Sequence, residues 1–109
     1  MRIVVAKSLV PKGFVGITIY PFVFLKEKKL EGNVVLINHE RIHLRQQVEL
    51  FIVFFFVWYG VEFLIRWLIL KDKTKAYRAI SFEQEAYVND INFNYLQQRK
   101  WFQFLKYLK

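Results

Sequence analysis

The pattern of apolar and polar residues changes character near residue 33. Before it, short apolar runs alternate with turn residues. A β-branched run at residues 2–6 predicts an edge strand, and a turn follows at Pro11-Lys12-Gly13. Residues 14–25 are rich in β-branched and aromatic side chains, which favours strand structure, and a glycine and a proline inside this segment restrict it to an edge or a bulge. The charged residues 26–32 predict a solvated connection.

After residue 33 the pattern favours helices. Asn33 suits the N-cap position of a helix that begins at Val34. This helix is expected to continue through a polar stretch to Glu49 and into the aromatic sequence FIVFFFVWYG. Gly60 is the first residue that could end it, as the glycine just past a helix C-terminus. A further apolar segment then runs to Leu70.

Residues 51–70 raise the question of a membrane span. About 20 apolar residues cross a bilayer, but the longest uncharged run here covers only residues 50–61, a length more typical of a buried or interfacial helix. Glu62 and Arg66, four residues apart in the order that favours a helical ion pair, would each cost a few kcal/mol in hydrocarbon. Hydropathy alone leaves both readings open.

The C-terminal third predicts further helices. Beyond a polar turn at residues 71–75, Ser81-Phe82-Glu83-Gln84 has the form of a capping box, which predicts a helix from Phe82 to about Gln97. The final RKWFQFLKYLK is predicted to be either a last core helix or a basic amphipathic segment on anionic lipid. The whole chain therefore predicts a single, mainly helical α+β domain over residues 1–109. It would have short N-terminal strands or a hairpin in residues 1–32 and three to four helices in residues 33–109.

Composition adds an expected partner. Hydrophobic residues make up 55% and aromatic residues 19% of the chain, which is high for a small soluble protein. The net charge of +8 favours an anionic neighbour, and because Lys and Arg are spread along the chain we expect a membrane surface and not nucleic acid. The apolar residues 3–6 are too short for a secretion signal. We therefore expect the cytoplasmic face of the inner membrane, or alternatively a soluble cytoplasmic protein.

The candidate chemistry lies in His39-Glu40-Arg41-Ile42-His43, which contains both histidines of the chain. On a helix, residues four apart share one face, so His39 and His43 could bind one Zn²⁺ while Glu40 acts on a metal-bound water. The alternative is an amphipathic helix whose two histidines simply share a face. Gln46 and Gln47, one turn further on, could hydrogen-bond a ligand's second nitrogen, although surface or helix contacts are expected first.

A catalytic zinc site needs a third protein ligand, and without cysteine it must be a carboxylate. Glu83 and Glu85 would lie at the start of a capped helix, whose dipole favours the ionised form. They are two residues apart, so at most one is expected to reach the metal. Glu49 is too close on the same helix, and Glu62 has Arg66 as a partner. The downstream candidates are Glu49, Glu62, Asp72, Glu83, Glu85 and Asp90.

A complete site also constrains the topology. If residues 34–70 formed one straight helix, His43 and Leu70 would lie about 40 Å apart at ~1.5 Å per residue, and residues 71–83 would have to return almost fully extended. A break near Tyr59-Gly60 removes this difficulty. The zinc hypothesis therefore predicts a helical hairpin, held in one leaflet, instead of a single crossing.

His39-Glu40-Arg41-Ile42-His43 followed by Glu83-Gln84-Glu85-Ala86 resembles the gluzincin metallopeptidases, and the small size is similar to the minigluzincins. The chain also looks similar to short uncharacterised proteins of flavobacterial type. The specific match covers residues 38–43 and 83–87, with Tyr87 where family members often have Asp or Asn.

The resemblance implies Glu83 as the third zinc ligand and Glu40 as the base that passes a proton to the leaving amine. It also implies substrate pairing along the strand at residues 14–25. An oxyanion stabiliser would still be needed; Tyr77, Arg78 and Tyr87 are candidates because they are near Glu83 in sequence, although a structural role is expected first for each. The expected function is thus that of a membrane-associated zinc metallopeptidase acting on a peptide or protein substrate. The alternative is a non-enzymatic, basic, membrane-bound helical protein without metal. The oligomeric state and the substrate stay open.

Overall fold

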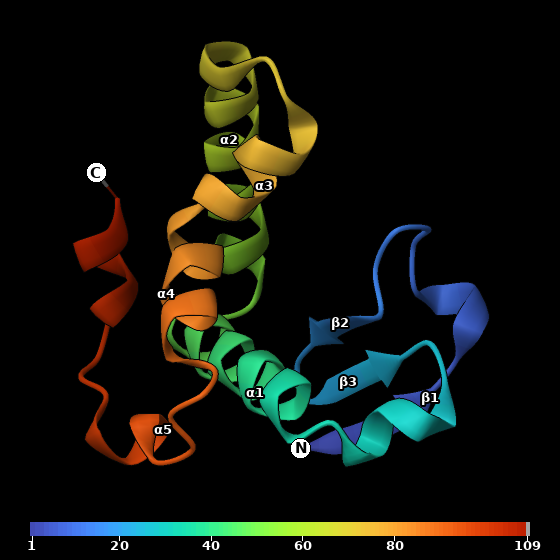
Figure 1. Ribbon diagram of the computed structural model, residues 1–109. Helices are drawn as coiled ribbons and strands as arrows, with labels where there is room; N and C mark the ends of the chain where they lie inside the picture. Colours follow the sequence, from blue (N-terminus) through green and yellow to red (C-terminus); the bar gives the residue numbers. More distant parts are fainter. Residues whose placement is uncertain (109) are drawn as a thin grey trace.

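The computed structural model describes residues 1–108 and has the predicted α+β, mainly helical architecture (Figure 1). A small sheet comes first in the chain and helices follow. The strands are β1 (Arg2–Val5), β2 (Gly16–Ile19) and β3 (Phe22–Leu25). The helices are α1 (Val34–Glu49), α2 (Val53–Leu70), α3 (Lys73–Ala79), α4 (Ser81–Asn89) and α5 (Tyr95–Gln98), and short 3₁₀ turns cover Lys7–Leu9, Lys28–Gly32 and Gln103–Tyr107.

The sheet has the strand order β1-β3-β2, with β1 parallel and β2 antiparallel to β3. The prediction that residues 2–6 form an edge strand is confirmed. The apolar segment at residues 14–25 is a hairpin instead of one strand, and Pro21, which has no N–H for a strand ladder, lies in its turn. Val23 and Leu25 pack under Leu44 of α1, so the sheet supports the helix that carries the histidines.

Helix α1 begins as predicted, because the Asn33 side chain accepts a hydrogen bond from the Leu36 N–H at 3.1 Å. The predicted break near Gly60 is wrong. The chain bends at residues 50–52, and α2 continues through Gly60 to Leu70. A glycine inside a helix costs only about 1 kcal/mol, which is too little to end a helix held by its neighbours.

The bend uses two residues with positive φ, Phe51 at 56° and Ile52 at 65°. Such conformations cost roughly 1–2 kcal/mol each for residues other than glycine. The bend turns Phe55 back into the core, where its ring lies 4.5 Å from that of Phe82 and 6.4 Å from that of His43. Burying one such aromatic side chain stabilises the fold by about 2–3 kcal/mol, which is comparable with the cost of the bend.

The helical hairpin that a complete site requires is made by α2 and α3. The chain reverses after Leu70, and α3 returns against α2 (Figure 1). This return brings the start of α4 beside the middle of α2, where the Tyr59 hydroxyl meets Glu83. An unbroken helix over residues 53–70 is therefore compatible with a closed site, because the bend before it and the return along α3 shorten the path.

Two expectations for the C-terminal region are wrong. Ser81 does not cap α4. Its hydroxyl and N–H both donate to the Glu62 carboxylate, which is buried under the first turn. The helix ends at Asn89 instead of near Gln97. Over residues 99–108 the tail forms no long helix, but its 3₁₀ turn buries Phe104 against Phe82 and Trp58.

Candidate metal centre

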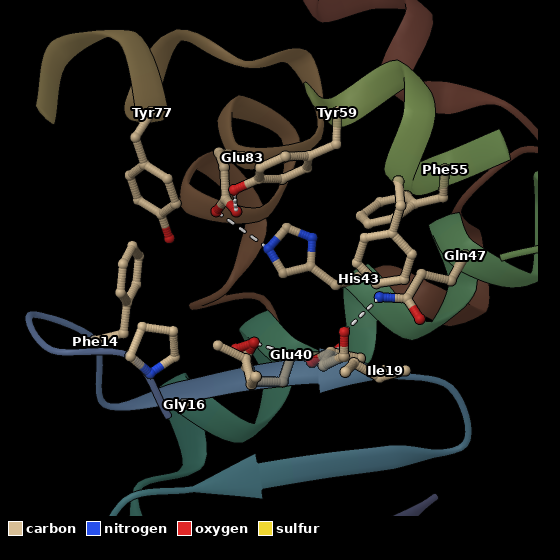
Figure 2. Close-up of a pocket in the computed structure, with 14 residues that line it drawn as sticks. Phe14, Gly16, Ile19, Glu40, His43, Gln47, Phe55, Tyr59, Tyr77 and Glu83 are labelled. Atoms are coloured by element: carbon tan, nitrogen blue, oxygen red, sulfur yellow. Dashed lines mark hydrogen bonds and ion pairs between the residues drawn. The ribbon is translucent and has the colours of Figure 1, made fainter. Parts of the chain in front are cut away.

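His39 and His43 on α1 converge with Glu83 from the first turn of α4. The two Nε2 atoms lie 3.2 Å apart, and Glu83 Oε1 lies 3.2 Å from His39 Nε2 and 3.1 Å from His43 Nε2. All three side chains are buried, with 8%, 6% and 5% of their surfaces exposed. Glu83 reaches inward from α4 toward His43 (Figure 2). Of the two candidate carboxylates at the start of this helix, Glu83 and Glu85, Glu83 is therefore the one that joins the cluster.

The three atoms form a nearly equilateral triangle that has the dimensions of a tetrahedral zinc site. With bonds of about 2.0 Å, neighbouring ligands of tetrahedral zinc are about 3.3 Å apart. The observed edges of 3.1–3.2 Å match this spacing. Hydrogen bonds alone explain the triangle less well than a metal ion does, because each of its three short edges would then need its own proton.

The tautomer of His43 follows from Gln46. The Gln46 amide nitrogen donates to the Phe82 carbonyl at 3.1 Å and to Glu85 at 2.9 Å. Its oxygen therefore faces His43 Nδ1 at 2.8 Å and accepts that nitrogen's proton. His43 Nε2 is left with its lone pair directed at Glu83 and His39. Gln46 therefore makes both predicted kinds of contact: its nitrogen makes helix–helix contacts with α4, and its oxygen binds the second ring nitrogen of His43.

His39 is oriented in the same way by a carboxylate. Asp90 Oδ2 lies 3.1 Å from His39 Nδ1, and a carboxylate can only accept there. The loop that carries Asp90 is held by Asn38, whose side-chain nitrogen donates to the carbonyls of Asp90 at 2.8 Å and of Asn92 at 3.1 Å. His39 therefore also presents its Nε2 lone pair to the cluster. This carboxylate–histidine arrangement is typical of metal-ligating histidines.

Glu83 is held at its second oxygen, where the Tyr59 hydroxyl donates at 2.7 Å. Burial alone would raise the pKa of Glu83, but the charge of His43 and the contacts with both rings hold it well below its usual range. Burial alone would lower the pKa of His43, whereas the charge and contact of Glu83 raise it to about 9. Without a bound cation, the raised pKa of His43 thus keeps a proton in the cluster, at the point where the lone pairs of His39, His43 and Glu83 converge.

Glu40 is buried beside the cluster but is not part of the triangle. Its Oε1 accepts a hydrogen bond at 3.0 Å from Thr18 on β2. Gln47 fixes the same strand, donating to the Thr18 carbonyl at 2.7 Å and accepting from the Tyr20 N–H at 2.7 Å. One backbone group of β2 and one just past its end are therefore already partnered, which restricts the predicted pairing of a substrate along this strand.

Two cavities meet at Glu40. One, of about 250 Å³, is mainly apolar and also reaches His43 and Glu83, with Phe55 and Tyr59 in its wall. The other, of about 820 Å³, is more open and reaches His39. Tyr77 lines both, and its hydroxyl points into the space between Glu40 and Glu83 (Figure 2). Burial, and next the charge of Glu83, raise the pKa of Tyr77, so its hydroxyl remains protonated.

The other candidate acids have partners of their own. Glu49 and Glu85 both accept from Arg99, Glu62 accepts from Ser81 and Trp58, and Asp72 caps α3 at the Lys75 N–H. Arg78 and Tyr87 both line the larger cavity beside His39, and they also contact each other, which fits the structural role expected first for them. The Arg78 guanidinium lies 4.0 Å from the Tyr87 ring, which packs at 4.5 Å against that of His39.

The supporting roles of Thr18, Tyr59 and Asp90 are not predicted by the sequence. Asp90 follows Glu83 by seven residues, two helical turns, and that spacing was a usable signal for a group on the same side of the site. Thr18 and Tyr59 come from elements whose packing on α1 has no local sequence signature. Comparison of the chain with protein-family models, with curated proteins and with solved structures found no match.

Proposed function

We propose that His39, His43 and Glu83 bind Zn²⁺ and that the chain is a zinc metallopeptidase-like hydrolase. The observation that carries this proposal is the buried triangle of two imidazole nitrogens and one carboxylate oxygen with edges of 3.1–3.2 Å. Each of the three groups has a partner behind it, Asp90, Gln46 or Tyr59, that directs its lone pair inward. Two His and one Glu form a donor set used by catalytic zinc sites, which leave a fourth position open.

Zinc bound by such a set lowers the pKa of a water molecule toward neutrality and polarises a carbonyl oxygen. The residues of the chain supply the rest. Glu40 is the proton carrier, because it is the carboxylate next to the triangle that has only a neutral hydroxyl, that of Thr18, as its hydrogen-bond partner. It accepts a proton from the attacking water and returns it to the amine that leaves.

The cavities favour a peptide as the substrate. The open cavity of about 820 Å³ leads past His39 to Glu40 and has room for an extended chain. The apolar cavity of about 250 Å³ on the other side of Glu40 has room for one apolar side chain. Tyr77 is protonated between them and donates to the carbonyl oxygen as negative charge develops there.

The test has a metal arm and an activity arm. Purified protein is expected to contain close to one zinc per chain by elemental analysis, and His39→Ala and Glu83→Ala are each expected to lose it. Glu31→Ala is the control, because it also removes a carboxylate, and Glu31 is exposed in the turn before α1, outside the triangle. A wild type without zinc after purification and after addition of one equivalent would refute the site.

For the activity arm, wild type and Glu40→Gln are compared on a mixture of quenched fluorescent peptides. Glu40→Gln is expected to keep its zinc and to lose cleavage by about 10²-fold or more, as general-base removal does. A variant that cleaves as fast as wild type would remove Glu40 from this role. Zinc binding without cleavage in either protein would leave the ion as a stabiliser of the fold and refute the hydrolase.

A further inference from the structure

The outer face of α2 is apolar and uncovered. Only 11% of the residues in this 18-residue helix are buried in the fold, and the helix is long and apolar enough to cross a bilayer. Eight large side chains that recur at helical spacing are each 51–69% exposed: Val53, Phe54, Val57, Val61, Leu64, Ile65, Leu68 and Ile69. A soluble monomer exposes single apolar residues routinely, but a continuous stripe of this kind marks an interaction surface.

The inner face of the same helix belongs to the folded domain. Phe55 is buried in the core, the Tyr59 hydroxyl donates to Glu83, and Glu62 accepts two hydrogen bonds from Ser81. If α2 crossed a bilayer, α3, the start of α4 and the metal cluster would have to enter the hydrocarbon with it. Charged and polar groups there cost several kcal/mol each. The helix is therefore suited to lie along a membrane and not to cross it.

Basic segments border α2 on two sides. The α3 side carries exposed Lys71, Lys73 and Lys75, and the Lys73 ammonium lies 4.8 Å from the Trp67 ring of α2.

On the other side the C-terminal tail runs along the helix. The Phe102 N–H donates to Glu49, at the end of α1, the Phe104 ring lies 5.1 Å from Trp58, and Arg66 donates to the Leu108 carbonyl. This tail carries exposed Lys100, Lys106 and Trp101. Lysine beside tryptophan is typical of segments at the headgroup level of a membrane.

We propose that α2 docks its outer face into one leaflet of an anionic bilayer, with the lysines of α3 and of the tail on the headgroups. Charge favours lipid over a second copy of the chain. A symmetric dimer through α2 would bring two sets of these lysines together in a chain of net charge +8, whereas anionic headgroups are complementary to them. The inference does not depend on the metal or on catalysis.

Binding is measured by sedimentation of the full chain with vesicles of phosphatidylglycerol and phosphatidylcholine in equal amounts, and with phosphatidylcholine alone. The chain is expected to bind the anionic vesicles, and more weakly at high salt. Lys100→Gln/Lys106→Gln is expected to reduce the partition constant about 10- to 30-fold, since each lysine near an anionic surface contributes roughly a factor of five. Lys28→Gln/Lys29→Gln, in the turn before α1, is the matched control and is expected to bind like wild type.

The apolar contribution is tested with Val57→Gln/Leu64→Gln/Leu68→Gln. The partition constant of this variant is expected to fall at least about tenfold. The control, Val34→Gln/Val88→Gln/Ile91→Gln, changes side chains of similar exposure outside α2 and the tail and is expected to bind like wild type. Equal binding of the α2 variant and the wild type would overturn the proposal. Failure of the wild type to bind anionic vesicles would do so too, as would self-association through α2 in place of lipid binding.

Because the chain has no cysteine, single introduced cysteines report the topology. Lys12→Cys and Lys73→Cys lie before and after α2, and both positions are exposed. With vesicle-bound protein, a membrane-impermeant maleimide is expected to label both from outside. Protection of Lys73→Cys alone would show that α2 crosses the bilayer and would refute docking in one leaflet.

Discussion

Replacing Arg99 with methionine is expected to be among the most destabilising single changes in the chain. Its guanidinium lies between two buried carboxylates and donates to Glu49 at 2.6 and 3.0 Å and to Glu85 at 3.1 Å, with a further short contact from Nε to Glu85. The side chains of both ion pairs have no exposed surface. Burial alone would lower the pKa of Arg99, but the hydrogen bonds of the two glutamates raise it, so the group stays charged.

The magnitude follows from what the substitution leaves behind. Glu49 retains one hydrogen bond, from the Phe102 N–H, and Glu85 retains those from Gln46 and Tyr95. Two negative charges then lie buried without a cation, and removal of one partner from a buried pair costs about 3–5 kcal/mol. A chain of 109 residues has a total stability of roughly 5–15 kcal/mol, so the variant is expected to lose a fifth or more of it.

Urea unfolding followed by circular dichroism measures this loss, with Lys100→Met as the control. Lys100 is the next residue and is exposed, so its loss is expected to change the free energy of unfolding by less than about 0.5 kcal/mol. Changing Glu49 and Glu85 to leucine together with Arg99→Met is expected to recover part of the loss, because the unpaired charges are then absent. A loss below about 1 kcal/mol for Arg99→Met alone would refute the reasoning.

Three further changes test the metal centre. Asp90→Asn removes the carboxylate behind His39 and is expected to weaken zinc binding about 10- to 100-fold in competition with a chromophoric chelator; unchanged affinity would contradict its orienting role. Because the pKa of His43 is raised from 6.5 to about 9, its charged form stabilises the metal-free fold fully below pH 6.5, and this contribution is lost as pH rises through 9. Zinc must displace that proton, so its apparent affinity is expected to rise about tenfold from pH 7 to pH 8 by calorimetry, and a flat profile would contradict the raised pKa. Thr18→Val removes the hydrogen bond to Glu40 and is expected to lower kcat for peptide cleavage severalfold with zinc content unchanged; parallel loss of zinc would instead indicate a general disturbance of the site.

The parts of the site that lie close together in sequence could be predicted. Two histidines four residues apart on a helix share a face whatever the rest of the chain does, and the Asn33 cap fixes where that helix starts. The sequence spacing did not distinguish Glu83 from Glu85 as the third ligand, and only the family resemblance favoured Glu83. In the structure Arg99, Gln46 and Tyr95 bind Glu85, and none of these pairings has a local sequence signature.

The bends could not be predicted because long-range contacts outweigh local preference there. Phe51 and Ile52 adopt a positive φ although neither residue type favours it, since the bend buries Phe55 beside Phe82. Gly60, the residue with the strongest local signal for a helix end, lies inside α2. The capping box at Ser81 failed for the same reason. The hydroxyl and N–H of Ser81 donate to the buried Glu62 carboxylate, and these hydrogen bonds are stronger than a local cap.

The distribution of polar atoms on α2 explains why its sequence resembles a membrane span while its structure is that of a domain helix. The Trp58 N–H, the Tyr59 hydroxyl and the Glu62 carboxylate face inward, Arg66 donates to the C-terminal tail, and the outer face is apolar. A helix on a water-facing surface has the opposite arrangement. This inversion fits a helix with lipid on one side and a polar site on the other. Substitutions such as Leu64→Gln are therefore expected to weaken vesicle binding without changing zinc content, and Tyr59→Phe to affect the zinc site without changing vesicle binding.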